Sequence, residues 1–291
     1  MANLKEIRNR IVSVSSTMQI TSAMKMVSAA KLKKAQDAIT SMRPYASKLN
    51  NLIQNLSSSL EPDMNSPFVS VREKNSILLV AITSNRGLCG AFNSNVIKKT
   101  RQLINEKFSD KKVSLITIGK KGSEVLGKKE NIISYHDYIF DDLNYEKADE
   151  ISKEIMQGFK KELYDEVILV YNRFKNAATQ IVETELFLPI EENIEENLDE
   201  KSLKSPDYIF EPNQSEIVNE LLPKALSIKF FKALRDSFAS EHGARMTAMH
   251  KATDNATELR DQLKLTYNKA RQAAITNEIL EIVGGAEALE G

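Results

Sequence analysis

The feature that most constrains this chain is an apolar repeat at each end that runs further than a compact domain allows. In residues 4–57 apolar side chains recur alternately three and four residues apart. They stand at Leu4, Ile7, Ile11, Val14 and Met18 and, after a break in phase near Ile20, Met24 and Val27, at Ala35, Ile39, Met42, Ala46, Leu49, Ile53 and Leu56. This spacing is typical of a coiled-coil seam, and the break predicts a stutter. A helix of about 54 residues would span roughly 80 Å and leave any globular body.

The same period returns from Asn213 and lasts almost to the end of the chain. The second seam comprises Met249, Ala252, Ala256, Leu259, Leu263, Tyr267, Ala270 and Ala274. Pro44 predicts a bend in the first helix, and Pro223 predicts a kink or a fresh start in the last. Gly284-Gly285 predicts its end. We therefore expect the two terminal helices to form an antiparallel coiled coil.

The middle of the chain changes to alternating strand and helix patterns. After a linker-like segment, 58–75, we predict strands over 76–83, 113–119 and 166–174, an edge strand over 179–190, and helices over 91–108 and 145–163. Strands that alternate with helices indicate a largely parallel α/β sheet. The acidic stretch 191–202 is expected to be a solvated loop. The predicted fold is thus α/β, with a Rossmann-like domain (58–212) inserted between two coiled-coil helices (1–57 and 213–291).

Composition excludes several classes of protein. The 40 basic and 40 acidic side chains cancel, which argues against coating nucleic acid by net charge. The charged side chains of residues 1–36 are nevertheless nearly all basic. A single cysteine, Cys89, allows no internal disulfide and predicts a reducing compartment. No apolar run approaches the ~18 residues that span a bilayer. The basic, serine-bearing start resembles a transit peptide, but its helical pattern continues past residue 40, so we expect a cytoplasmic protein.

Candidate chemistry is sparse. The loop 85–90 lies between a predicted strand and helix, but it lacks the G-K-[ST] ending and the G-x-G-x-x-G spacing of phosphate-binding loops. Cys89 has no nearby histidine, and His136, His242 and His250 are too dispersed to predict a metal site. We expect no catalytic residue, no cofactor and no metal. Two rivals remain: a nucleotide-binding enzyme with a coiled-coil handle, and a nucleic-acid or membrane-surface binder that uses the basic first helix.

The far end of the predicted coiled coil combines the apolar stretch 273–283 with the methionine- and alanine-rich stretch 23–32. Such a surface left in water is an interaction site or an aggregation hazard. The sequence therefore predicts that another protein surrounds this end.

The terminal motifs resemble a known family. KEIRNRIVSVSSTMQITSAMKMVSAAKLKKAQ near the N-terminus, SEHGARMTAMHKATDNATEL and YNKARQAAITNEILEIVGGAEAL near the C-terminus, and TSNRGLCGAFNSN in the middle are similar to F-type ATP synthase γ subunits. Ile275, Thr276, Glu278, Glu281, Gly285 and Ala286 match the family's C-terminal signature. The chain departs from the family pattern at Asn85, at Ala91-Phe92 and at Gly243. A glycine within a helix is expected to soften it by about 1 kcal/mol.

The resemblance implies a non-catalytic central rotor shaft. It would couple proton or other ion translocation through a membrane c ring to ATP synthesis or hydrolysis in a hexamer of three α and three β subunits. It would also bind an ε subunit, at the cytoplasmic face of the inner membrane. The implied β-subunit contacts are Arg8, Arg10, Met24, Lys25, Arg271, Gln272 and Thr276, and the implied ε and c-ring contacts are Tyr208, Phe210 and Glu211. For the basic residues of the first helix, above all Lys31, Lys33 and Lys34, a merely solvated face stays open as the alternative.

Overall fold

A computed structural model describes residues 4–58, 68, 72–190 and 214–290. The chain divides into two compact units. Unit 1 comprises Met1–Ala29 and Arg245–Gly291, and unit 2 comprises Ala30–Ala244. The acidic stretch 191–202 and most of the linker 58–75 lie outside the described residues, as do the side chains of Ala46, Ile53 and Leu56.

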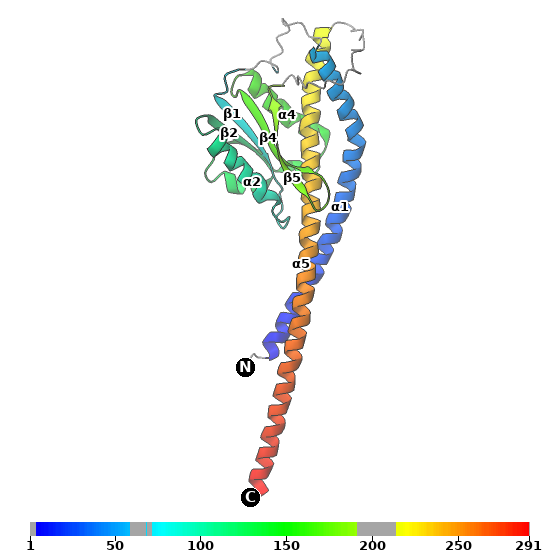
Figure 1. Cartoon of the computed structure of the whole chain (residues 1–291), viewed down its shortest axis with the longest axis vertical. Helices are drawn as coiled ribbons and strands as arrows, with labels where there is room; N and C mark the ends of the chain where they lie inside the picture. Colours follow the sequence, from blue (N-terminus) through cyan, green and yellow to red (C-terminus); the bar gives the residue numbers. More distant parts are fainter. Residues whose placement is uncertain (1–3, 59–67, 69–71, 191–213, 291) are drawn as a thin grey trace, which may run out of the picture. The chain divides into compact units, whose positions relative to one another are not determined.

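The two predicted terminal helices are confirmed. α1 covers Leu4–Ser58 with 55 residues, and α5 covers Gln214–Glu290 with 77 residues (Figure 1). Pro223 lies inside α5, so it does not start a new helix, and α5 continues through Gly284-Gly285, so the predicted stop there is wrong. Glycine lowers helix propensity by only about 1 kcal/mol, and the helix-forming residues around this pair outweigh it. A bend at Pro44 or Pro223 stays a prediction.

The seam of α1 has no stutter, contrary to our prediction. Its least exposed described positions follow one unbroken heptad: Leu4, Ile7, Ile11, Val14, Met18, Thr21, Lys25, Ser28, Leu32, Ala35, Ile39, Met42 and Leu49. Ile20 and Val27 are exposed. The repeat looked broken in the sequence because Thr21, Lys25 and Ser28 fill seam positions with polar atoms. An apolar pattern alone cannot recognise such positions.

In unit 1 the two helices run antiparallel, as predicted. The Arg260 guanidinium lies 3.4 Å from the sulfur of Met18, and the hydroxyls of Thr21 and Thr253 are 2.8 Å apart. Lys25 Nζ lies 3.3 Å from His250 Nδ1. Residue numbers rise along one helix as they fall along the other, which fixes the direction. Such polar pairs between the helices favour this register, because a shift along the seam would separate them.

The α5 seam differs from the prediction at three positions: Thr253 takes the place of Ala252, Arg260 takes the place of Leu259, and Ala274 is exposed. Leu259 is exposed, and the neighbouring Arg260 is half-buried in its place. Arginine can lay its aliphatic stem along an apolar surface while its guanidinium finds polar partners. The observed seam therefore runs through Met249, Thr253, Ala256, Arg260, Leu263, Tyr267 and Ala270.

Unit 2 contains a five-stranded sheet of order β3-β2-β1-β4-β5 (Figure 1). The strands are β1 (Ser76–Ile82), β2 (Lys112–Ile118), β3 (Ile132–His136), β4 (Glu166–Phe174) and β5 (Gln180–Leu188). The first four are parallel, and β5 pairs with β4 antiparallel at the edge. The largely parallel sheet and its edge strand are thus confirmed. The prediction missed α3 (Lys120–Leu126) and β3, which are both short, and the pairing of β3 with β2 also shifts register.

Each face of the sheet has its own core. On one face, α4 (Tyr145–Lys160) and the first part of α5 pack through residues such as Ile155, Phe159 and Phe230. On the other face, α2 (Phe92–Gln102), the π-helix η1 (Leu103–Lys107) and α3 cover Leu79 and Leu115. Continuous burial of β1 on both faces explains why its sequence reads as an unbroken apolar run.

Close packing explains why a glycine stands at position 243, inside a helix. A Cβ added there would lie 3.2 Å from the carbonyl oxygen and 3.3 Å from the Cα of Ala177, in the turn between β4 and β5. The glycine therefore lets this turn approach the α5 backbone closely.

Gly119 gives a direct test of the sheet unit. Its φ is +92°, and an added Cβ would clash with the backbone carbonyl of Thr83, so no simple side-chain movement relieves the overlap. We expect Gly119→Ala to lower the free energy of unfolding by about 2–5 kcal/mol, from strain and overpacking together. Urea unfolding followed by circular dichroism measures this.

Gly87→Ala is the matched control, because an added Cβ there meets nothing within 4 Å. Its effect should stay within about 0.5 kcal/mol. Equal effects of the two substitutions would contradict the close approach at Gly119.

Candidate functional site

The C-terminal part of α5 forms an exposed tip that still carries large apolar side chains. Every residue from Arg271 to Ala286 is exposed. The apolar members are 47–67% exposed; they are Ile275, Ile279, Leu280, Ile282 and Val283. At about 100° per residue they fall within an arc of about 160° around the helix. A single helix does not bury so wide an apolar stripe by itself, so the tip is suited to contact with another protein.

The predicted contacts Arg271, Gln272 and Thr276 lie at the start of this tip, and all three are exposed. The Thr276 hydroxyl donates to the Gln272 carbonyl at 2.9 Å. Gln272, Thr276 and Ile279 follow the i, i+4, i+7 spacing of one helix face. The side-chain amide of Gln272 and the guanidinium of Arg271 are therefore presented beside the apolar stripe.

The predicted contacts on α1 do not form one face. Arg8 and Arg10 are exposed but stand two residues apart, about 200° around the helix. Met24 lies two heptads after Arg10 and shares its side of the helix. Lys25 is a half-buried seam residue whose amine meets His250, which in turn lies 3.4 Å from Asp254. Of the four, Arg10 and Met24 can serve a common surface.

Sequence reasoning recognised only part of an exposed apolar set on α1. It placed 23–32 together with 273–283, which is wrong, because Lys25 lies against His250, far along α5 from the tip. Val12, Ile20, Met26 and Val27 are all exposed. Ile20 and Val27 are one heptad apart, and Val12 and Met26 are two heptads apart, so the four form a stripe away from the seam. The signal was present: once Thr21 and Ser28 are accepted as seam residues, Ile20 and Val27 must face outward.

The predicted ε and c-ring contacts, Tyr208, Phe210 and Glu211, lie outside the described residues.

The loop 84–93 uses its polar groups on itself and on neighbouring loops. Asn93 accepts from the Ser84 backbone N–H at 2.9 Å, and its amide donates to Cys89 Sγ at 3.3 Å. The Asn85 side chain accepts from the Lys120 N–H at 3.0 Å and donates to the Asp137 carbonyl at 2.6 Å. These bonds join three loops at the carboxyl edge of the sheet, where a Rossmann-like domain would bind a nucleotide. They describe a structural junction rather than a phosphate cradle.

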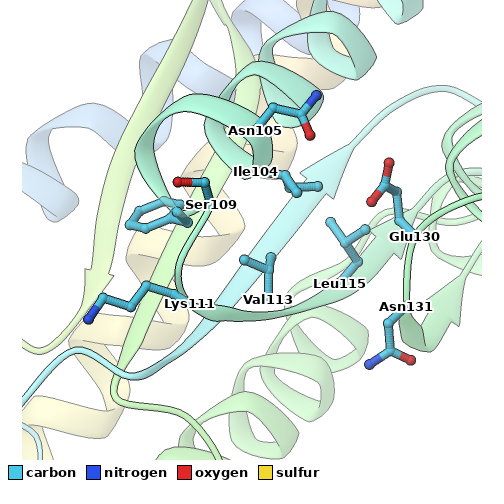
Figure 2. A pocket seen from close by; sticks show the side chains of 9 residues that line it. Ile104, Asn105, Ser109, Lys111, Val113, Leu115, Glu130 and Asn131 are labelled. Carbon is cyan, nitrogen blue, oxygen red and sulfur yellow. The ribbon is translucent and has the colours of Figure 1, made fainter.

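A cleft of about 320 Å³ lies at the opposite edge, where β2 and β3 begin (Figure 2). Its apolar members include Ile104, Val113 and Leu115, and its charged members are Lys111 and Glu130. Lys111 Nζ lies 3.5 Å from the Asn75 side-chain oxygen. The cleft is thus remote from the edge at which ligands of such sheets bind.

Among the described residues, no three His, Cys, Asp or Glu side chains are grouped so that they could hold a metal ion. Within the same part of the chain, none of the helices has both the length and the apolar character to cross a membrane.

Comparison with known proteins decides the family. A family model described as ATP synthase matches residues 3–289. The ATP synthase gamma chain of Flavobacterium johnsoniae is 63% identical over 291 residues and covers 100% of both chains, and that of Geobacter sp. is 47% identical over 292 residues with the same coverage. The chain belongs to the ATP synthase gamma chain family. The sequence resemblance is confirmed.

Solved structures agree with this assignment. A chain of the Tetrahymena thermophila mitochondrial ATP synthase central stalk and c ring is 28% identical, with a TM-score of 0.62, over 80% of this chain and 99% of that chain. A chain of the Euglena gracilis mitochondrial ATP synthase has a TM-score of 0.69 over 98% of this chain and 94% of that chain. At 21% identity, the second likeness speaks for the fold alone. Long terminal helices with an inserted α/β sheet are therefore the family's architecture.

The exposure of the tip can be tested on the chain itself. We expect the double variant Ile279→Gln and Ile282→Gln to bind less hydrophobic dye and to self-associate less, because both side chains face water. The free energy of unfolding should change by less than about 0.5 kcal/mol. Dye fluorescence, sedimentation and urea unfolding measure these three quantities.

Met249→Gln with Ala256→Gln is the control, since both residues are buried in the seam. It should lower stability by more than about 2 kcal/mol, because buried polar groups lack partners there. A tip variant as destabilised as the seam variant would show that the tip is packed.

Proposed function

We propose that the chain is the central rotor shaft of an F-type ATP synthase. It couples proton or other ion movement through a c ring to ATP synthesis or hydrolysis on a hexamer of α and β subunits. Family membership supports a non-catalytic rotor subunit, and the similar Tetrahymena chain comes from a structure of a central stalk and c ring. The single observation that carries the mechanism is the exposed apolar tip of α5.

The proposed mechanism depends on the shaft making different contacts with the different subunits of the ring. A shaft that touches one side of a ring more than the others makes otherwise equivalent sites inequivalent, and its rotation then moves each site through alternative states in turn. The tip stripe covers about 160° rather than the whole circumference, so it supplies such asymmetry. One elementary charge that crosses 100 mV is worth about 2.3 kcal/mol, so several ions must be combined for each ATP.

The residue assignments are part of this proposal. Arg271, Gln272 and Thr276 would contact a β subunit where the stripe begins, together with Arg10 and Met24 on α1. Arg8 and Lys25 would contribute from other sides. Tyr208, Phe210 and Glu211 would meet the ε subunit and the c ring. The domain division 1–57, 58–212 and 213–291 belongs to the same picture, with the chain peripheral to the membrane at its cytoplasmic face.

The two rival functions have weaker support. An enzyme would offer free polar groups at the carboxyl edge of the sheet, whereas Asn85 and Asn93 are engaged with neighbouring loops. A nucleic-acid binder would need a continuous basic face on α1, and the exposed Val12, Ile20 and Val27 interrupt it.

Reconstitution with the cognate α and β subunits tests the function. We expect one copy to join each hexamer and to raise ATP turnover, measured by native mass and by ATPase rate. A disulfide between Thr276→Cys and a β-subunit cysteine should then stop turnover, and a reductant should restore it. A chain that stays out of the hexamer, or an ATPase rate indifferent to it, would contradict the proposal.

The tip contacts have a separate test. Arg271→Ala should weaken assembly with the hexamer by about 10- to 150-fold, because a hydrogen bond to a charged group is worth about 1.5–3 kcal/mol. Titration of hexamer ATPase with each variant measures this. Lys264→Ala is the matched control: it removes an exposed charge on the same helix outside the tip, and it should assemble as the unaltered chain does. If both substitutions weakened assembly equally, the effect would come from the lost positive charge in general, and a specific contact of Arg271 would be contradicted.

A further inference from the structure

Within unit 2, the first part of α5 is held to the sheet and to α4 by an apolar core and by polar contacts that include three directional links. The core includes Leu226, Phe230 and Leu234, all nearly inaccessible to water. Apolar packing is non-directional, so it resists separation of two surfaces more strongly than it resists sliding. The polar links are directional and involve Ser227, Lys229 and Ser240.

The first link joins α5 to α4. The hydroxyls of Ser227 and Ser152 are 2.7 Å apart, and both residues are about fully buried. A buried hydroxyl pair keeps its bond because neither member can find water instead.

The second link joins α5 to the sheet edge. The Lys229 ammonium donates to the Leu186 carbonyl at 2.6 Å and lies 3.5 Å from a Glu185 carboxylate oxygen. The other Glu185 oxygen accepts from the Tyr171 hydroxyl at 2.8 Å, and Tyr171 is buried in β4. Lys229 is therefore attached to β5 directly and to β4 through Glu185.

The third link lies three turns further along α5. The Ser240 hydroxyl donates to the Asn172 carbonyl of β4 at 2.9 Å, and the Asn172 amide donates to the Phe92 carbonyl of α2 at 3.1 Å. Ser240 and Asn172 are both buried. This chain of bonds runs from α5 through the sheet to the helix on its opposite face.

The three links act from two sides of the helix. At about 100° per residue, Lys229 and Ser240 lie within about 20° of each other, whereas Ser227 lies about 140–160° away. A rotation of α5 about its own axis cannot preserve bonds on both sides, and a hydrogen bond weakens steeply with small changes of length and angle. The close approach of Ala177 to Gly243 adds a steric stop near the same end.

We propose that Ser227, Lys229 and Ser240 are positioning residues that lock α5 against rotation and sliding on the sheet. They let torque pass between the α/β unit and the helix without slip. The inference rests on the proposed rotor function, since only a loaded shaft needs such a lock. Apolar packing holds the helix when no torque acts, and the directional links hold it under load.

The test uses the complete membrane-bound enzyme with the triple variant Ser227→Ala, Lys229→Met, Ser240→Ala. We expect protons pumped per ATP hydrolysed, measured against an opposing proton gradient, to fall at least threefold. The ATPase rate of the detached soluble complex should stay within twofold, because no load acts on the sheet there. The double variant Lys224→Met, Lys232→Met, which alters exposed lysines of the same helix segment, is the control and should pump normally.

The outcomes separate this inference from the rotor function. If the unaltered chain neither assembles nor pumps, the rotor function itself fails. If the unaltered chain pumps and the triple variant pumps equally well under load, the lock is refuted while the rotor function stands. If the triple variant does not assemble, the same ratio is measured for Lys229→Met alone, with Lys229→Arg as the variant that should restore it; unchanged pumping by Lys229→Met then refutes the lock.

Discussion

The structure depends on keeping the seams of two very long helices out of water. α1 has 55 residues and α5 has 77. Isolated helices gain little stability from helix propensity alone. Each therefore needs a continuous partner surface. In unit 1 that surface is the other helix, fixed in register by Thr21 with Thr253 and by Lys25 with His250. In unit 2, α5 finds it on the sheet and α4.

The C-terminal part of α5 has no partner helix among the described residues, so its apolar side chains are available to bind another protein. From Arg271 to Ala286 α5 is exposed, yet it keeps the isoleucines, leucine and valine of an interior helix. A chain that folded alone would gain nothing from those residues. Under the proposed rotor function, they would supply the surface through which the surrounding ring of subunits contacts the shaft asymmetrically.

The sequence predicted the elements that repeat or run long. It identified both terminal helices, the antiparallel pairing, the parallel strands β1, β2 and β4, and the edge strand β5. It failed where polar residues occupy seam positions. Thr21 and Ser28 in the α1 seam were interpreted as a stutter, and Arg260 takes the seam position that was assigned to Leu259. It also missed α3 and β3, whose few residues carry too little periodicity to stand out.

The candidate site divides in the same way. The apolar surface at 273–283 was foreseen, but its combination with 23–32 was wrong, because the helices pair with Lys25 against His250. The separation of Arg8 from Arg10 around α1 followed from helix geometry but was hidden by their shared charge. The links from α5 to the sheet could not be foreseen, because serines, a lysine and a glycine on a helix show their partners only after the chain is folded.

Rotation of this chain inside the hexamer is the most direct test of its role as a rotor shaft. The exposed Ser94 of α2 would be replaced by cysteine (Ser94→Cys) and a bead attached to it. The α and β subunits of the complex would be fixed to a surface, and the bead followed as ATP is added. We predict sustained rotation in one direction whose rate follows ATP turnover and which stops when the tip is crosslinked to β. A bead that stays still while the same complexes hydrolyse ATP would contradict the claim that this chain is the shaft.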